Sequence, residues 1–491
     1  MESQIRQLRE AQREWSAMSI RHRLRILKRA RHLLAAEAEQ FIPDISPDLV
    51  RSPADTLAAE VLPVLAACEF LEREAGFILR PRILGRRGLP LWLWGVRSEI
   101  HRVPMGVVLI IGASNYPLLL AGAQALQALA AGNAVVWKPG TGGRAVAERL
   151  ARLLARAGLP DGLLLITDES PDAAQQAIAA GVDKVFFTGS AATGRIVMRQ
   201  LAETLTPSVM ELSGCDAVFV LDGADLHRAA DALAFGVALN GSATCMASRR
   251  LFATSTTLSA LLPLLQEKLR HAPQVPLPLR TRHLLDQIIA NARARGATIL
   301  DSQAAAEPTS NAAAEFTPPA AARPADNASS TLILNATPDM LAMQADIFAP
   351  LLSLCVVESE AAALAAYARC SYALTAAVFG AEREALALAR QLEAGSVLVN
   401  DLIAPTVDPR VPFGGRRDSG FGVTRGAEGL LEMTAIKVVL VRRGNDKHHY
   451  AKSSDAHTDF FAGYMQASHG KGLGTRWRGL IRALKAATKI G

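Results

Sequence analysis

The feature that most constrains the fold is a long run, Val103 to Trp137, without a single charged side chain. The run exceeds the ~20 apolar residues that span a bilayer. Glycines and a Ser-Asn-Tyr-Pro turn beginning at Ser114 interrupt it. These breaks predict a strand over 106–111, a helix over about 119–131 and a strand over 134–137, each apolar enough to be buried on both sides. We therefore expect a buried α/β core rather than a membrane span.

The same alternation of short apolar segments and Ala-rich helical segments continues to about residue 221, which is typical of a doubly wound parallel sheet. The expected strands are Val107–Ile111, Ala134–Trp137, Leu163–Ile166, Lys184–Phe187 and Ala217–Leu221. Residues 1–80 have the spacing of helices, and Leu89–Val96 with Ser98–Val103 predicts a hairpin. A second α/β stretch runs over about 222–405. Within it, Ala304–Ser330 is rich in Ala, Pro, Asn and Ser and is expected to be a surface loop.

The positive charge of the chain, 53 Lys and Arg against 46 Asp and Glu, lies at one end. The segment 441–491 holds ten basic and three acidic residues, so residues 1–440 are neutral overall. A neutral body argues against a nucleic-acid-binding domain. Residues 476–490 predict a basic amphipathic helix with Trp477 and Leu480 on its apolar face. Such a helix either contacts an anionic membrane surface peripherally or docks on the protein itself or a partner subunit.

The five cysteines are scattered and form no Cys-x-x-Cys pair, so the sequence encodes neither a disulfide framework nor a zinc site. The histidines of the tail, such as His448 and His449, lack accompanying acidic or Cys ligands, and we expect no metal. The N-terminus has no apolar signal segment. These features favour a cytoplasmic location, with attachment to a membrane surface if the tail binds one.

Three residues could carry chemistry. Cys245 lies among small polar neighbours in an uncharged stretch, where a cysteine is either an inert core residue or a nucleophile. Glu211 stands between apolar residues before a Gly turn, so its carboxylate is either ion-paired or a base. Asn115 follows a strand and either caps a turn or donates to an oxyanion.

Two turns after strands could hold a cofactor, although the sequence contains no Gly-x-Gly-x-x-Gly motif behind a strand. Lys138 and Thr141 lie in the first turn, and Gly189 and Ser190 lie in the second. A Thr-Gly-Ser turn that opens a helix suits a pyrophosphate, because free N–H groups and the helix dipole favour an anion there.

Together these segments resemble the NAD(P)-dependent aldehyde dehydrogenases over about residues 10–443, in order and with similar spacing. The segments are Asn115-Tyr116-Pro117 for Asn-Phe-Pro, Lys138-Pro139 for Lys-Pro, Phe187-Thr188-Gly189-Ser190 for the pyrophosphate turn, Glu211-Leu212-Ser213-Gly214 for Glu-Leu-Gly-Gly, Asp346-Ile347-Phe348-Ala349-Pro350 for Glu-Ile-Phe-Gly-Pro, and Pro412-Phe413-Gly414-Gly415 with Ser419-Gly420 near the substrate mouth. The resemblance implies that Cys245 is the nucleophile, Glu211 the general base and Asn115 the oxyanion donor. It implies cofactor contacts from Lys138, Thr141, Gly189, Ser190, Asp346 and Phe348.

The resemblance also implies an α/β fold with two doubly wound domains and a small β element for oligomerisation. The expected parts are a cofactor-binding domain (1–84 and 105–213), the β element (85–104 and 434–443), a catalytic domain (214–433) and the basic tail (444–491). The implied activity is oxidation of a small-molecule aldehyde to a carboxylic acid with NAD or NADP, in a homodimer or homotetramer.

Three positions depart from the family pattern. Thr141 stands where NAD-preferring members often carry Glu, so the repulsion of a 2′-phosphate is removed and NADP becomes a candidate. Asp346 is one methylene shorter than the usual Glu, and Ser213 replaces a glycine.

Two other functions stay open. One is an acylating dehydrogenase or acyl reductase, against which Glu211 argues because such an enzyme needs no base to activate water. The other is a catalytically silent binding protein on the same fold, disfavoured by the presence of Cys245, Glu211 and Asn115 together. Tyr116, Trp92 and the Asp401–Arg410 loop suggest an apolar pocket for the aldehyde.

Overall fold

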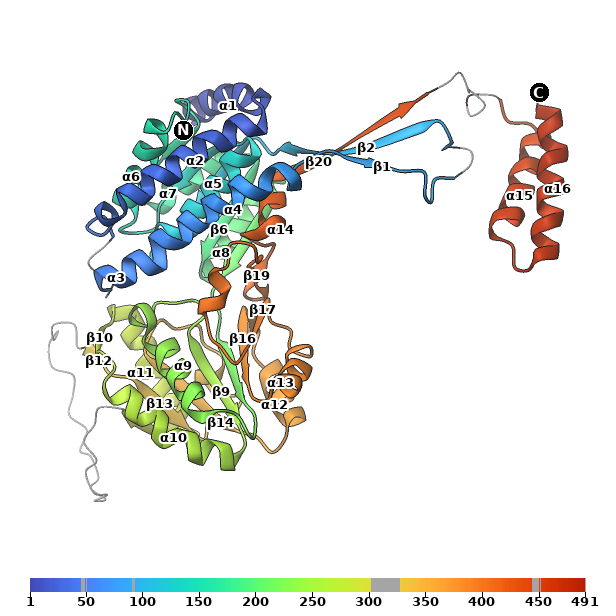
Figure 1. Cartoon of the computed structure of the whole chain (residues 1–491). Coiled ribbons are helices and arrows are strands. Elements are labelled where there is room, and N and C mark those ends of the chain that lie inside the picture. The colour runs from blue at the N-terminus through green and yellow to red at the C-terminus, as the bar shows by residue number, and fades with distance from the viewer. Residues whose placement is uncertain are drawn as a thin grey trace, which may run out of the picture. The chain divides into compact units, whose positions relative to one another are not determined.

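A computed structural model describes residues 1–45, 49, 51–90, 93–301, 327–443, 450 and 452–490 (Figure 1). They form two compact units, one from Met1–Arg82 with Ile100–Lys437 and the other from Ile83–Glu99 with Val438–Gly491. Both large sheets lie in the first unit, and the fold is of the predicted α/β class with parallel strands.

The first sheet has six strands in the order β19-β7-β6-β3-β4-β5, and only β19 and β7 are antiparallel neighbours. Its strands are β3 (Val107–Ile111), β4 (Ala134–Lys138), β5 (Leu164–Ile166), β6 (Lys184–Gly189), β7 (Ser208–Leu212) and β19 (Gly420–Phe421). Its helices are α1 (Glu2–Ala17), α2 (Ile20–Ala36), α3 (Pro53–Thr56), α4 (Leu62–Ile78), α5 (Leu119–Ala131), α6 (Arg144–Arg156), α7 (Pro171–Ala179), α8 (Ala191–Thr204) and α14 (Gly426–Glu432).

The uncharged run forms the centre of this sheet's core, as predicted. Every residue of β3 and β4 is buried, and α5 buries all its residues except Leu120. The helix ends at Gly132, whose φ of 97° suits a residue without a side chain. In the described part of the chain, no helix is long and apolar enough to cross a membrane.

The second sheet has seven strands in the order β11-β13-β14-β9-β8-β16-β17, with only β11 and β13 antiparallel. Its strands are β8 (Asp216–Val220), β9 (Ser248–Ala253), β11 (Thr298–Asp301), β13 (Thr331–Leu334), β14 (Leu351–Val356), β16 (Thr375–Phe379) and β17 (Ser396–Val399). Its helices are α9 (Leu226–Ala238), α10 (Ser255–Arg270), α11 (Leu279–Ala294), α12 (Glu360–Ala368) and α13 (Glu382–Ala389). Two-residue strands β10 (Val275–Pro276) with β12 (Asn327–Ala328), and β15 (Tyr372–Ala373) with β18 (Arg416–Arg417), form two small ladders.

Side chains of the second sheet alternate between two hydrophobic cores. Ala217 and Phe219 of β8 belong to the core that also contains residues of α11, α12 and α13. Val218 and Val220 belong to the core with residues of α9 and α10. This period of two is what a strand buried on both faces produces, and it explains why residues 217–220 of β8 are all apolar.

Two sequence expectations need correction. The strand expected at 217–221 belongs to the second sheet, and β7, which the sequence analysis did not identify, completes the first sheet. The hairpin expected from Leu89–Val96 is also wrong. The strand next to β2 (Val96–Pro104) is β1 (Arg82–Leu84), in a three-stranded sheet of order β1-β2-β20 with β20 (Thr434–Arg442). Leu93 and Trp94 lie in neither strand, directly before a turn at Gly95.

The segment expected to be a surface loop, Ala304–Ser330, lies outside the described residues up to position 326. Its described end is not all loop, because Asn327–Ala328 form β12. The second unit contains the tail, described at 450 and 452–490. The tail forms the helix α15 (Asp455–His469) and the helix α16 (Leu473–Ile490).

Candidate active site

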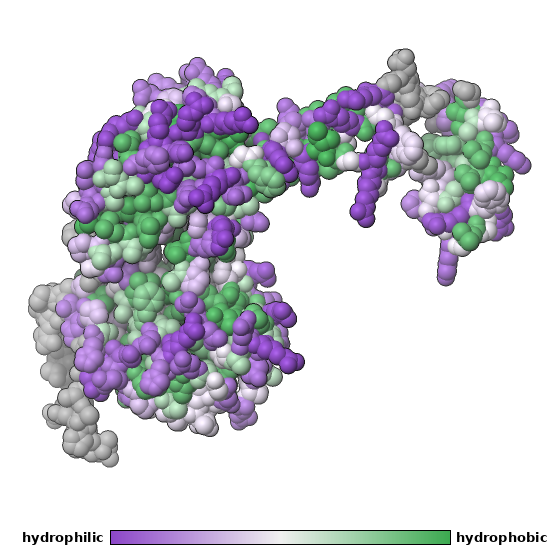
Figure 2. Space-filling view, viewed as in Figure 1, coloured by the Kyte–Doolittle hydropathy of each residue, from purple (hydrophilic) through white to green (hydrophobic). Residues whose placement is uncertain are grey.

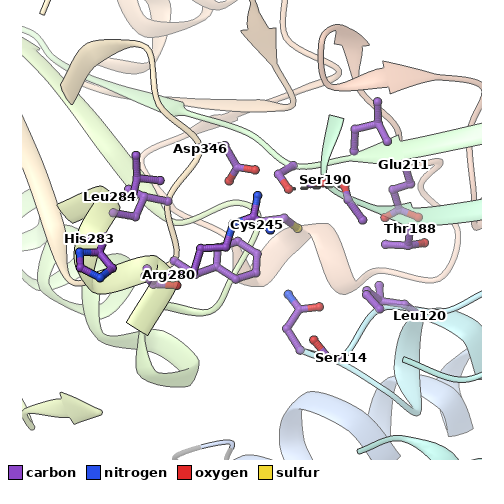
Figure 3. Close-up of a pocket in the computed structure, with 18 of the residues that line it drawn as sticks. Ser114, Leu120, Thr188, Ser190, Glu211, Cys245, Arg280, His283, Leu284 and Asp346 are labelled. Atoms are coloured by element: carbon purple, nitrogen blue, oxygen red, sulfur yellow. Dashed lines mark hydrogen bonds between the residues drawn. The ribbon is translucent and has the colours of Figure 1, made fainter. Parts of the chain in front are cut away.

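One cavity of about 880 Å³ lies where strands of the first sheet end and meet loops that precede strands of the second (Figure 3). Seven of the nine predicted site residues line it: Asn115, Gly189, Ser190, Glu211, Cys245, Asp346 and Phe348. Asn115 follows β3, Gly189 ends β6 and Glu211 lies near the end of β7. The carboxyl ends of parallel strands share one edge, which explains why segments far apart in sequence converge there.

Cys245 lies in the loop between α9 and β9, and its side chain is half-buried. Three consecutive residues before it, Asn240, Gly241 and Ser242, have left-handed backbone angles, with φ of 55°, 57° and 64°. Such angles persist only when surrounding contacts enforce them. Burial raises the pKa of the Cys245 thiol, and the nearby Glu211 raises it further. The thiol therefore stays protonated until a base removes its proton.

Arg249 is the contact that holds this loop. Its guanidinium is buried and donates to the carbonyl of Ser242 at 2.8 Å and to the carbonyl of Ala349 at 2.6 Å. Ala349 belongs to the segment that carries Asp346 and Phe348. Arg249 thus links the Cys245 loop to the segment that carries Asp346 and Phe348.

Glu211 is almost fully buried, and its carboxylate has few partners. Its Oε2 accepts hydrogen bonds from the Thr424 hydroxyl at 3.3 Å and from Gln124 Nε2 at 3.4 Å, both long. Burial raises the pKa of Glu211, while the buried Arg425 guanidinium and Thr424 lower it. A weakly held carboxylate with a raised pKa has the properties of a general base near neutral pH.

Asn115 is fixed through both its side chain and its backbone carbonyl. Its Nδ2 donates to the carbonyl of Ala243 at 2.9 Å, and its backbone carbonyl accepts from Asn240 Nδ2 at 3.1 Å and from Arg51. Arg51 in turn forms a buried ion pair of 2.6 Å with Glu60. These bonds tie the Asn115 turn to the loop that carries Cys245.

Asp346 and Ser213, the two residues that differ from the family pattern near the cavity, lie close together in the structure. Burial raises the pKa of Asp346, and a hydrogen bond from the Ser213 side chain opposes that shift. The Ser213 hydroxyl also lies 3.5 Å from the carbonyl of Gly189. Ser213 therefore places beside the shorter Asp346 side chain a hydroxyl that a glycine cannot supply, and this hydroxyl lowers the pKa of Asp346.

Lys138 and Thr141 do not line the cavity. Lys138 ends β4 and is buried, which lowers the pKa of its ammonium, and Glu169 and Asp168 raise that pKa. Thr141 is exposed in the turn before α6. Glu169 accepts backbone N–H bonds of 2.9 Å from Gly142 and 2.9 Å from Arg144, so its carboxylate caps the start of α6.

The residues suggested for an apolar pocket are only partly at the cavity. Tyr116 is buried beside it, with its hydroxyl 2.8 Å from Thr244 Oγ1 and its ring against the Arg51 guanidinium. Val407 and Pro409 of the 401–410 loop line a small space with Leu119, which is large enough for about one water molecule. Trp92 lies outside the described residues.

Sequence reasoning missed the residues that hold the site: Arg51, Gln124, Arg249, Thr424 and Arg425. It also missed Arg280 and His283, which reach the cavity from α11. One signal was present, because charged residues such as Arg249 in an otherwise uncharged stretch must find buried partners. The described residues contain no cluster of three His, Cys, Asp or Glu that could hold a metal, and His448 and His449 lie outside them.

Comparison with known proteins agrees with this arrangement. The family model described as "Aldehyde dehydrogenase family" matches residues 1–439. The chain therefore belongs to the aldehyde dehydrogenase family, as its motifs predict, and is an oxidoreductase that acts on aldehydes.

Individual relatives cover most of the chain. A 4,4'-diapolycopene aldehyde oxidase of Methylomonas sp is 28% identical, over 88% of this chain and 80% of that protein. A protein of Pseudomonas aeruginosa named "Probable coniferyl aldehyde dehydrogenase" is 30% identical, over 85% of this chain and 86% of its own. Among solved structures, an NAD-dependent aldehyde dehydrogenase from Sinorhizobium meliloti matches with a TM-score of 0.80 and 25% identity, over 91% of this chain and 88% of that chain.

Proposed function

We propose that this protein oxidises an aldehyde to a carboxylic acid with NAD or NADP, through a covalent intermediate on Cys245. The observation that carries the proposal is the convergence of Cys245, Glu211 and Asn115 on one cavity with Gly189, Ser190 and Asp346. Five strands of the six-stranded sheet, β3 to β7, would then belong to the cofactor-binding domain (1–84 and 105–213), and its edge strand β19 would come from the catalytic segment. The seven-stranded sheet would belong to the catalytic domain (214–433).

The chemistry follows from the properties of these side chains. Glu211 takes the proton of the Cys245 thiol, and the thiolate attacks the aldehyde carbon to form a thiohemiacetal. Asn115 Nδ2 and the backbone N–H of Cys245 donate to its oxyanion. A bound nicotinamide cofactor supplies the acceptor for the hydride, which leaves a thioester on Cys245. Glu211 releases the proton it took from Cys245 to solvent and then takes a proton from water, whose oxygen attacks the thioester carbon. The carboxylic acid leaves, and the departing Cys245 thiolate takes that proton back from Glu211.

The cavity suits a dinucleotide in size and in chemistry. Its volume of about 880 Å³ lies within the range of small-molecule sites. Gly189 and Ser190 line it directly before the first residue of α8, so the positive end of that helix dipole favours a phosphate there. We propose that Asp346 binds the nicotinamide ribose and that Phe348 lies next to this ribose. Lys138 and Thr141 would bind the adenosine ribose.

The choice between NAD and NADP depends on Glu169 as well as Thr141. Thr141 carries no charge that would repel a 2′-phosphate. The neighbouring Glu169 carboxylate, which caps α6 and acts on Lys138, does carry one. We expect both cofactors to bind, NAD the more tightly.

Replacing Glu169 with Gln should therefore tighten NADP binding by about fivefold and leave NAD binding nearly unchanged, since one like charge near a 2′-phosphate is worth ~1 kcal/mol. Isothermal titration calorimetry with each cofactor measures this directly. The matched control is Asp172→Asn, which removes an exposed carboxylate in the first turn of α7. Equal strengthening for both cofactors would contradict a specific action on the 2′-phosphate.

We also propose that the enzyme is a homodimer or homotetramer formed through the three-stranded sheet. Ile436, Val438 and Leu440 of β20 each expose more than half of their surface, an apolar row that a second subunit would cover. All five cysteines are free, which supports a reducing cytoplasmic location.

A panel of aliphatic and aromatic aldehydes with NAD and with NADP tests the function. We expect aldehyde-dependent reduction of a cofactor, formation of the free carboxylic acid without coenzyme A, and complete loss of both in Cys245→Ala. Cys355→Ala, which removes another buried thiol, should retain activity. A product that forms only as the coenzyme A thioester would identify the acylating alternative. If no aldehyde of the panel led to reduction of NAD or NADP, the result would favour the alternative of a catalytically silent binding protein.

A further inference from the structure

The helices α15 and α16 of the second unit pack through small residues. A Cβ atom placed on Gly463 would lie 2.5 Å from the backbone nitrogen of Ala483, and one on Gly479 would lie 2.5 Å from that of Ala467. The two backbones therefore touch, and no large side chain fits between them. Figure 1 shows the two helices side by side. Small residues at four-residue spacing are typical of helix pairs in membranes, where large apolar side chains need not be buried in the pair.

As a consequence, the large apolar side chains of this hairpin point outward. Leu473 is 86% exposed, Trp477 64%, Met465 61% and Leu484 59%. With Tyr464 and Leu480, several of them line an open apolar groove of about 680 Å³. Figure 2 shows hydrophobic residues on the visible side of both helices. An open apolar groove flanked by exposed apolar side chains marks a site where something else binds.

The basic residues of α16 form a second stripe. Leu473, Trp477, Leu480 and Leu484 repeat at intervals of four, three and four residues, and so do Arg478, Arg482, Lys485 and Lys489. Because each residue turns an α-helix by about 100°, the offset of five positions separates the two stripes by roughly 140°. Residues 452–490 carry seven Lys and Arg against two Asp.

We propose that the α15–α16 hairpin binds the surface of an anionic membrane. Its apolar groove lies at the boundary of headgroups and acyl chains, and the basic stripe contacts acidic headgroups through long, flexible side chains. The helices do not cross the bilayer, in line with the lack of a spanning helix among the described residues. A second copy of the hairpin is less suited to cover the groove, because the seven basic residues of each copy would repel those of the other.

This inference goes beyond the catalytic function and is independent of it. The family model ends at residue 439, before α15 begins, so the hairpin lies outside the part of the chain that the model matches. Attachment to a membrane would concentrate the enzyme where apolar aldehydes partition.

Co-sedimentation of the full-length protein with vesicles tests the proposal. We expect binding to vesicles that contain phosphatidylglycerol and at least tenfold weaker binding to pure phosphatidylcholine. Removing three charges in R478Q/K485Q/K489Q should weaken binding by about a hundredfold at low salt, because each basic side chain near an anionic surface is worth about fivefold. Removing the apolar face in Trp477→Ser/Leu484→Ser should weaken binding to both kinds of vesicle.

Matched controls come from the first unit. R6Q/R13Q removes exposed charges of α1, and Leu205→Ser removes an exposed apolar side chain; neither should change binding. All variants should oxidise aldehyde at the parental rate in the absence of vesicles, so failure of this proposal is distinguishable from failure of the catalytic one. For the unmodified protein, raising the salt concentration should release it from anionic vesicles.

The proposal is overturned if the unmodified protein ignores anionic vesicles. Such a result would mean that the protein's own body or a second copy covers the groove. A change of oligomeric state in Trp477→Ser/Leu484→Ser, with vesicle binding intact, would overturn it in favour of the second copy.

Discussion

The enzyme with Glu211 replaced by Gln should release about one equivalent of reduced cofactor per active site and then nearly stop. The first hydride transfer needs a single deprotonation of Cys245, which water or hydroxide can perform slowly in place of Glu211, whereas hydrolysis of the thioester needs a base for every water. We expect the first turnover to slow and steady turnover to fall by about 10²–10⁴-fold, the usual contribution of a general base. Stopped-flow absorbance of the reduced nicotinamide separates the burst from the steady rate.

The pH dependence of kcat gives a second test of Glu211 as the base. Burial raises the pKa of Glu211, so the proportion of carboxylate, and with it kcat, should rise with pH in the unmodified enzyme. That rise should disappear in Glu211→Gln. Glu203→Gln, an exposed carboxylate of α8, should behave like the parent. A Glu211→Gln enzyme that turns over steadily at the parental rate would exclude Glu211 as the base.

Replacing Arg249 with Gln should have the largest effect on stability. Its guanidinium bonds with the carbonyls of Ser242 and Ala349 are buried and charge-assisted, and losing them should lower the free energy of unfolding by about 3 kcal/mol. Activity should fall further than stability explains, because the Cys245 loop would lose its left-handed turn. Urea unfolding and kcat at low temperature, where the variant remains folded, measure the two effects.

Two further variants distinguish a positioning role from general damage. Arg249→Lys keeps the charge and at least one of the bonds, so it should recover part of the activity. Arg228→Gln removes an exposed arginine at the start of α9 and should change neither quantity. If Arg249→Gln unfolds at the parental urea concentration and turns over normally, the loop is fixed by other contacts.

Much of the fold could be predicted from local patterns. The uncharged run became β3, α5 and β4 because its glycines and turn residues divide it at the places where the chain reverses. The sequence pattern did not predict β7 because Glu211 interrupts its apolar residues. The Glu211 carboxylate is nevertheless buried, because it faces the cavity. The prediction placed the first strand of the three-stranded sheet at Leu89–Val96 because bulky residues favour strands, although Pro90 cannot donate a hydrogen bond to a ladder.

The chemical residues of the site were readable from motifs, whereas the residues that position them were not. Arg51 reaches Asn240 across 189 positions of sequence, and Thr424 reaches Glu211 across 213. No local pattern encodes a bond of that separation. Ser213 and Asp346 show the same limit: each departs from the family pattern alone, and only the fold brings the hydroxyl to the shorter carboxylate.

The most direct test of the account is a mass measurement on Glu211→Gln enzyme, quenched after mixing with an aldehyde and the oxidised cofactor. The account predicts a gain equal to the mass of the aldehyde less two hydrogens, located by proteolysis on the peptide that contains Cys245. The adduct should be absent without cofactor and in the Cys245→Ala enzyme. An adduct on any other residue, or cofactor reduction with no acyl group on Cys245, would contradict the covalent mechanism.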